Sequence, residues 1–188
     1  MRIALKFTLL LIIGIALPAQ ANERLREANF TPQVQLEQSQ LVLKNQDVLT
    51  YLWADVYAAA FYAAPSISPD QAFNDKLSQR LELYYFRNIK REDVIKAAWV
   101  TLERQNDSQT LARLRPQIDA LHRHFADIRS GDRYALNYQP GSGLSLERNG
   151  QALFHSDDAQ LAKAYLGIWL APKGLSDKLR DNLLASRE

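Results

Sequence analysis

The sequence predicts an α+β fold in which a large antiparallel β-sheet carries a layer of helices on one face. Segments with the two-residue alternation of strands come first, followed by two segments with helical periodicity, further strands and two more helices. Turn residues separate neighbouring strands, and hairpins of this kind make a sheet antiparallel. Helices that come in pairs are expected to cover one face of such a sheet.

Residues 1–21 have the layout of a secretory signal peptide. A basic start precedes an apolar run over residues 7–17, and Pro-Ala-Gln-Ala then provides a small-x-small cleavage signal. Cleavage is expected before Asn22, which leaves one domain over residues 22–188. An uncleaved anchor is the less favoured alternative, because the apolar run is shorter than the roughly 20 residues that span a bilayer. We therefore expect no stable membrane anchor after cleavage.

Charge and cysteine content indicate a periplasmic protein that binds no nucleic acid. The chain carries a net charge of +2, and the two basic residues of the leader account for it. The mature chain is therefore neutral, whereas nucleic-acid binders carry a basic surplus. The chain has no cysteine, so its core alone must hold it together. An exported protein without cysteine is typical of a bacterial periplasm.

The first half of the mature chain predicts strands interrupted by one short helix. Residues 22–33 are polar and are expected to lack regular structure, and short strands follow over residues 34–43. Residues 48–63 are interpreted as one long strand rich in aromatic side chains. Ser68 is placed to cap a short helix that has Pro69 at its first position.

Alternation and helical spacing then define a strand and two helices. Residues 80–87 alternate so that their inward apolar side chains share one face of a strand. A helix is predicted over residues 91–104, where apolar side chains form one stripe. A second helix is predicted over residues 108–125, and Pro116 is expected to kink or divide it.

The last third of the chain predicts three strands and two helices. Residues 132–138 alternate as a strand, and residues 144–154 form a hairpin around Asn149-Gly150, a pair that favours a type I′ turn. A helix is expected from an Asp157 cap to Leu170, and a last helix begins at a Ser176 cap and runs to about Ala185.

The predicted aromatic strand over residues 48–63 has two different faces. One face carries Tyr51, Trp53, Asp55, Tyr57, Ala59 and Phe61. Its aromatic walls, its phenols and the gap at Ala59 suit an apolar pocket with a few polar groups, and ordinary core is the alternative. The other face, from Leu52 to Tyr62, is small and apolar and is expected to let the helices pack closely.

No motif in the chain predicts a catalytic, metal or cofactor site. His122 and His124 are two residues apart on a predicted helix and therefore point to different faces, and His155 stands alone. The Gly-Ser-Gly over residues 141–143 precedes a strand, so it is a turn and not a nucleophile elbow. The charge run over residues 87–93 is interpreted as a solvated loop and the start of a helix.

Four segments in chain order carry a family resemblance, among them VYAAAFYAAP at residues 56–65. The others are residues 81–99, 131–153 and 164–184. Together they resemble the bacterial chalcone-isomerase-like family of small exported proteins, over nearly the whole mature chain. The resemblance implies the chalcone isomerase fold, with a ligand cleft between sheet and helices. Plant enzymes of this family close chalcones to flavanones, and related non-enzymatic members bind fatty acids through an arginine and a strand tyrosine.

Tyr57 stands at the place of that tyrosine, but the arginine has no counterpart. Lys44 is the one basic residue over residues 44–50, where the arginine is expected. An oxyanion donor in a dry site is commonly worth about 3 kcal/mol of barrier, so its absence argues against the plant reaction.

We therefore expect a non-catalytic protein that binds a small apolar ligand such as a fatty acid. One alternative is an isomerase or intramolecular lyase, with Tyr57 as hydroxyl donor and Arg87 or Lys96 as the substitute cation. Another is a structural or interaction protein of the cell envelope. The candidate ligand-binding residues are Tyr51, Trp53, Tyr57, Arg87, Lys96, Trp99 and Tyr165.

Overall fold

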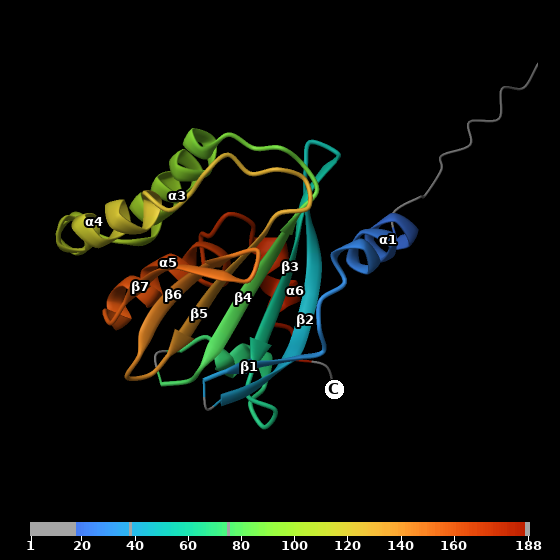
Figure 1. The fold of residues 1–188 in the computed structure, drawn as a ribbon, viewed down its shortest axis with the longest axis horizontal. Coiled ribbons are helices and arrows are strands. Elements are labelled where there is room, and N and C mark those ends of the chain that lie inside the picture. The colour runs from blue at the N-terminus through green and yellow to red at the C-terminus, as the bar shows by residue number, and fades with distance from the viewer. Residues whose placement is uncertain (1–17, 38, 75, 187–188) are drawn as a thin grey trace, which may run out of the picture.

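The computed structural model describes residues 18–37, 39–74 and 76–186. Within these residues, seven strands form one antiparallel sheet in which each strand pairs with its neighbours in the chain (Figure 1). The predicted α+β class is confirmed. The apolar run over residues 7–17, on which the predicted signal peptide depends, lies outside the described part of the chain.

Short turns join β1 to β2, β2 to β3, β5 to β6 and β6 to β7, whereas α2 lies between β3 and β4, and α3 and α4 lie between β4 and β5. The strands are β1 (Gln33–Leu36), β2 (Ser39–Tyr51), β3 (Ala54–Ala63), β4 (Gln79–Tyr85), β5 (Arg133–Gln139), β6 (Gly143–Arg148) and β7 (Gln151–Ser156). The helices are α1 (Pro18–Ala28), α2 (Pro69–Ala72), α3 (Arg91–Gln105), α4 (Ser108–His122), α5 (Ala159–Leu170) and α6 (Asp177–Leu183). Over the described residues, no helix is both long and apolar enough to cross a membrane.

The single long strand predicted over residues 48–63 is wrong, because the chain reverses in its middle. Leu52 and Trp53 have φ angles of 44° and 54°, and Tyr51 pairs with Ala54 across the turn. Left-handed backbone is uncommon at large side chains, so the composition of this segment does not indicate a turn. The predicted tight turn at Asn149-Gly150 is confirmed, with φ angles of 51° and 80°.

The core lies between the inner face of the sheet and helices α3 to α6. The inward positions of β3, β4 and β5 belong to one apolar cluster, including Ala59, Leu83 and Leu136. A helix packs on the Ala58 and Ala60 face of β3 as predicted, and that helix is α1 together with the segment that follows it. Helices α3 to α6 cover the opposite face.

Three further local predictions differ from the structure. The polar residues 22–33 hold most of α1, which packs on the outer face of β2 and β3. Pro116 lies inside one uninterrupted α4, because the buried Leu114 and Ile118 keep both halves of the helix against the core. The cap of α5 is Asp158, whose carboxylate accepts from the backbone of residues 160 and 161, and not Asp157.

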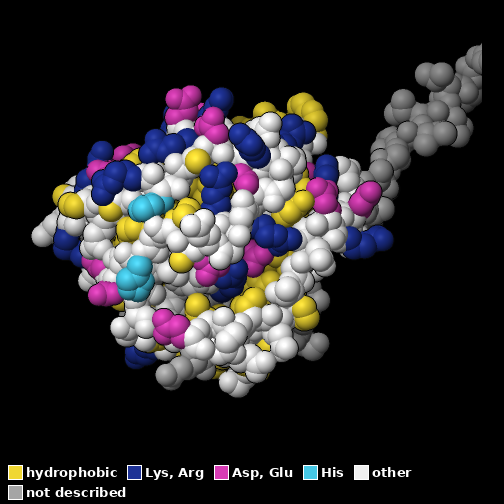
Figure 2. Space-filling model, viewed as in Figure 1, with side chains coloured by type: hydrophobic (Ala, Val, Ile, Leu, Met, Phe, Trp, Pro, Cys, Tyr) yellow, Lys and Arg dark blue, Asp and Glu magenta, His cyan; other side chains and the backbone are white. Residues whose placement is uncertain are grey.

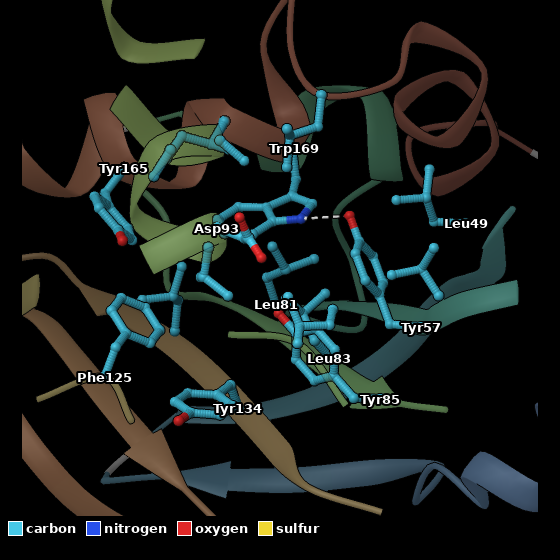
Figure 3. Close-up of a pocket in the computed structure, with 18 of the residues that line it drawn as sticks. Leu49, Tyr57, Leu81, Leu83, Tyr85, Asp93, Phe125, Tyr134, Tyr165 and Trp169 are labelled. Atoms are coloured by element: carbon cyan, nitrogen blue, oxygen red, sulfur yellow. Dashed lines mark hydrogen bonds between the residues drawn. The ribbon is translucent and has the colours of Figure 1, made fainter. Parts of the chain in front are cut away.

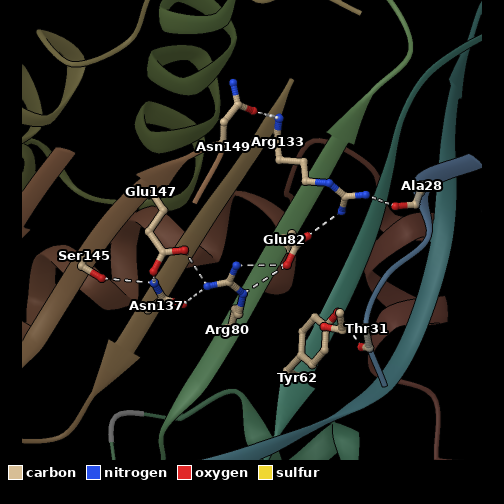
Figure 4. Close-up of polar contacts among 10 residues, drawn as sticks. All are labelled: Ala28, Thr31, Tyr62, Arg80, Glu82, Arg133, Asn137, Ser145, Glu147 and Asn149. Carbon is tan, nitrogen blue, oxygen red and sulfur yellow. Dashed lines mark hydrogen bonds and ion pairs between the residues drawn. The ribbon is translucent and has the colours of Figure 1, made fainter. Parts of the chain in front are cut away.

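A balanced ionic network covers part of the outer face of the sheet (Figure 4). Arg80 pairs with Glu147 at 2.8 Å and with Glu82 at 3.0 Å. Arg133 pairs with the other oxygen of Glu82 at 2.7 Å and donates to the carbonyl of Ala28. The two cations and two anions compensate one another, so the network attaches the end of α1 to the sheet and leaves no charge free for a guest.

Candidate functional site

A cavity of about 360 Å³ lies between the inner face of the sheet and the helical layer (Figure 3). Its size falls within the usual range for small-molecule sites. Most of its wall is apolar or aromatic. The lining residues are Leu49, Tyr51, Val56, Tyr57, Leu81, Leu83, Tyr85, Ile89, Asp93, Val94, Ala97, Ala98, Phe125, Tyr134, Leu136, Leu146, Tyr165, Ile168, Trp169 and Leu175.

The cavity exists because large side chains on the sheet face small ones on a helix. Strand alternation directs Tyr57, Tyr85 and Tyr134 to the inner face. Across from them, α3 presents Ala97 and Ala98 to the same space. Close packing would need larger side chains at these helix positions, so the alanines leave room for a guest.

The roof of the cavity is fixed by a buried hydrogen bond. The indole Nε1 of Trp169, on α5, donates to the hydroxyl of Tyr57 at 2.9 Å (Figure 3). Both side chains are buried, and burial raises the pKa of the Tyr57 phenol above its ordinary value. The phenol therefore stays protonated at neutral pH, and its own proton remains available to a guest.

A second polar pair joins α4 to α5 at the wall. His122 Nε2 and the Tyr165 hydroxyl are 3.1 Å apart. Burial lowers the pKa of His122 to about 4, with Arg91 and Arg115 adding to the shift and Asp119 opposing it. The imidazole is therefore neutral at neutral pH, and burial likewise raises the pKa of Tyr165.

Tyr85 has a hydroxyl that is free to meet a ligand. It stands between Tyr57 and Tyr134, with ring centroids 5.3 and 6.1 Å away. Its hydroxyl makes no hydrogen bond with any residue that the structure describes. Burial raises its pKa well above the ordinary value, so it is a neutral donor in an apolar wall.

Charge is nearly absent from the wall. Of the described lining residues, Asp93 alone carries a charge, and it is exposed at the mouth, on the first turn of α3. No lysine, arginine or histidine is among them. Within the described ranges, no group of three or more acidic or histidine side chains could hold a metal ion. The site can therefore enclose an apolar body and offer it phenolic hydrogen bonds.

The structure brings three of the seven predicted site residues together. Tyr51, Tyr57 and Tyr165 line the cavity, while Trp53, Arg87, Lys96 and Trp99 do not. Trp53 lies in the turn after β2 and is 91% exposed. The Arg87 guanidinium is exposed and donates to the carbonyl of Asp55 at 3.1 Å.

The remaining two predicted residues lie elsewhere on α3. Lys96 is exposed to solvent. The ring of Trp99 packs under the Arg115 guanidinium, 4.4 Å from its centroid, and edge-on to His122. Both are therefore surface or second-layer positions with respect to the cavity wall.

Sequence reasoning missed several residues that shape the wall. Trp169 follows Tyr165 by one helical turn, so the predicted helix already placed both side chains on one stripe. Tyr85 and Tyr134 are inward positions of predicted strands. Asp93 stands in a mixed charge run, and nothing in its local sequence distinguishes it from an ordinary acid at a helix start.

This architecture defines a sheet-and-helix protein with an internal apolar cavity. A family model described as chalcone isomerase-like matches residues 22–185. The chain belongs to this family. Comparison with curated proteins gives no match.

Among solved structures, the chain is similar to a fatty-acid binding protein of Arabidopsis thaliana. The two share 15% sequence identity with a TM-score of 0.57, and the similarity covers 82% of this chain and 90% of the plant protein. At this identity the similarity shows the fold alone, so the chalcone isomerase-like fold is established by the family and by the structure together.

Proposed function

We propose that this chain is an exported, periplasmic member of the bacterial chalcone isomerase-like proteins that binds a small apolar ligand without catalysis. The observation that carries the proposal is the cavity, whose wall is apolar apart from phenols, one indole and Asp93 at the mouth. Apolar pockets with a few fixed polar groups are the usual form of a ligand site.

The character of the wall supports binding over catalysis. Isomerisation with Tyr57 as hydroxyl donor requires a cation or other strong donor at the developing oxyanion. Arg87 and Lys96, the candidate substitute cations, do not line the cavity. Because burial raises the pKa of Tyr57, this phenol is also a weaker acid than in water.

The apolar wall of the cavity and the related structure support a ligand with a hydrocarbon chain. The plant neighbour is a fatty-acid binding protein, and a hydrocarbon chain suits a wall of leucine, valine and aromatic side chains. We place the hydrocarbon against the sheet and the polar head toward Asp93 and the mouth. The Tyr85 hydroxyl is a free donor that a carbonyl or ether oxygen of the ligand would meet.

A displacement titration tests this proposal. Nile red, an uncharged apolar dye, is titrated into the protein and then displaced by fatty acids of increasing chain length. Ala98→Phe fills the cavity from α3, whereas Val100→Phe places the same ring on an exposed position of the same helix. We expect Ala98→Phe to abolish dye binding and Val100→Phe to retain it. Equal binding by both variants would place the dye outside the cavity and contradict the proposal.

Export is supported by the leader and by the family match, which begins at residue 22, where cleavage is expected. Cell fractionation followed by intact mass measurement tests it. The expected result is a periplasmic protein that begins at Asn22. A cytoplasmic protein that retains residues 1–21 would contradict export.

A further inference from the structure

Four of the five large apolar side chains that are exposed in the described residues lie at or next to the cavity mouth. The five are Tyr51, Leu52, Trp53, Val100 and Leu175, and Val100 is the one that lies elsewhere, on α3. Three of them are consecutive at the turn between β2 and β3, with exposed fractions of 68%, 62% and 91%. Figure 2 shows hydrophobic side chains at the top of the molecule, over this turn, with lysine or arginine side chains beside them. We call Tyr51, Leu52, Trp53 and Leu175 the rim patch.

The rim patch is continuous with the cavity. Tyr51 and Leu175 are exposed and also line the cavity wall, so they stand at its mouth. Leu52 and Trp53 follow Tyr51 directly and extend the apolar surface outward along the hairpin. Scattered single apolar residues on a surface need no explanation, but a contiguous group at the mouth of a cavity does.

The turn that carries the patch is anchored at its base. The Asp55 carboxylate accepts from the Thr50 hydroxyl at 2.8 Å and from Arg24 Nε at 3.2 Å. Arg87 donates to the backbone carbonyl of the same residue. These hydrogen bonds fix the position of the β2–β3 hairpin, so the side chains of Leu52 and Trp53 at its tip stay exposed instead of packing against the core.

Residues 87–96, close to the lining residue Ile89, carry a net positive charge. Arg87 and Lys90 precede α3 and Arg91 and Lys96 lie on it, all exposed, against the two exposed acids Glu92 and Asp93, and Lys90 pairs with Asp127 at 3.3 Å. Tryptophan and tyrosine prefer the interface between water and lipid, and surface lysine and arginine are attracted to anionic lipid headgroups. The apolar side chains of Leu52 and Trp53, together with the net positive charge of residues 87–96, are complementary to an anionic lipid surface.

We propose that the rim patch docks the cavity mouth on an anionic lipid surface. This inference rests on the proposed function, because docking lets an apolar ligand pass between bilayer and cavity without crossing water. Leu52 and Trp53 insert among the lipid headgroups. The cations on residues 87–96 approach the phosphates, and Tyr51 and Leu175 cover the passage into the cavity.

Vesicle flotation tests the docking. The protein is purified from cells that express the full chain, so every variant has the same N-terminus. It is mixed with phosphatidylcholine vesicles with or without phosphatidylglycerol. We expect the double variant Leu52→Ser/Trp53→Ser to bind vesicles about tenfold or more weakly than the unaltered protein. Val100→Ser removes an exposed apolar side chain that does not line the cavity and is expected to change nothing.

Charge provides a second arm of the same experiment. Lys90→Gln/Lys96→Gln is expected to weaken binding severalfold on vesicles with phosphatidylglycerol and to have little effect on phosphatidylcholine alone. Raised salt should have the same effect as this substitution, because it screens exposed charges. Equal flotation of the unaltered protein and the Leu52→Ser/Trp53→Ser variant would overturn the proposal.

Two controls separate docking from ligand binding. Leu52→Ser/Trp53→Ser should still bind Nile red in solution, and Ala98→Phe should lose the dye while still binding vesicles. Loss of dye in every protein would refute the proposed function and leave docking standing. Sedimentation without vesicles tests a second copy of the chain as the occupant: a dimer that the Leu52→Ser/Trp53→Ser variant abolishes would overturn lipid docking.

Discussion

Two tyrosines in the same cavity wall are expected to respond in opposite ways to loss of the hydroxyl. Tyr57 and Tyr85 are both buried, at 4% and 5% exposure, and their ring centroids are 5.3 Å apart. The Tyr57 hydroxyl accepts the buried indole N–H of Trp169 at 2.9 Å. The Tyr85 hydroxyl has no such partner among the described residues.

Tyr57→Phe leaves the Trp169 N–H buried without an acceptor. An unsatisfied buried donor costs about 1–3 kcal/mol of unfolding free energy. For a domain of this length each kcal/mol lowers the melting temperature by roughly 2–4 °C, so we expect a decrease of roughly 2–12 °C. Tyr85→Phe removes a hydroxyl that has no partner among the described residues, and its melting temperature should be unchanged or slightly higher.

For ligand binding, we expect the larger effect from Tyr85→Phe, the substitution that has the smaller effect on the melting temperature. Because the Tyr85 hydroxyl is a free donor in the wall, Tyr85→Phe should weaken binding of a ligand whose oxygen reaches it, by about fivefold to tenfold for one neutral hydrogen bond. Thermal unfolding by circular dichroism, with and without ligand, measures both effects. Equal destabilisation by the two substitutions in the ligand-free protein would refute this assignment of the hydroxyls.

Three other predictions concern acid, backbone and ligand charge. The folded pKa of His122 is about 4 and the unfolded value about 6.5, so the unfolded chain takes up the proton first. The free energy of unfolding should therefore fall by on the order of 3 kcal/mol as pH drops from about 6.5 to about 4. In acid denaturation curves, His122→Gln should show a smaller fall over the same pH range. Gly143→Ala should destabilise more than Gly141→Ala in urea melts, because both have positive φ but only the methyl at 143 would collide with the Ser156 carbonyl. Lauryl alcohol should displace Nile red at severalfold lower concentration than laurate at neutral pH, because the charge at the mouth is Asp93 and no lining residue is a cation.

Each of these has a distinct contrary outcome. Identical acid curves for the unaltered protein and His122→Gln would mean that the histidine is not kept neutral by burial. Equal urea midpoints for the two glycine variants would contradict the close approach of Gly143, on β6, to the Ser156 carbonyl at the end of β7. Tighter binding of laurate than of the alcohol would indicate that a cation reaches the ligand head.

Most of the fold could be predicted because local signals and tertiary structure agree. Alternation in residues 80–87 and helical spacing in residues 91–104 correspond to β4 and α3 within a few residues. The turn at Leu52-Trp53 could not be predicted, because it holds two bulky side chains in left-handed backbone and none of the usual turn residues. The helix over the polar residues before Ala28 likewise depends on packing against β2 and β3, which local sequence does not reveal.

Site residues could be predicted only where the pattern of a single strand or helix indicates which way the side chain points. Tyr57 was found from its strand, and Tyr165 from its helix. The bond between Tyr57 and Trp169 joins positions 112 residues apart, so no local pattern indicates it. The turn that the sequence did not indicate also explains why Trp53 is not in the predicted pocket. The chain reverses at Leu52-Trp53, so Trp53 lies at the exposed tip and the residues after it belong to a different strand.

Native mass spectrometry of the protein purified from cells without detergent, followed by lipid extraction, tests the central claim most directly. We expect a defined mass adduct on the unaltered protein and on Val100→Phe, and a clean apo mass for Ala98→Phe. The extracted compound should contain a hydrocarbon chain. An adduct of the same mass on all three proteins would contradict a ligand in the cavity between the sheet and α3.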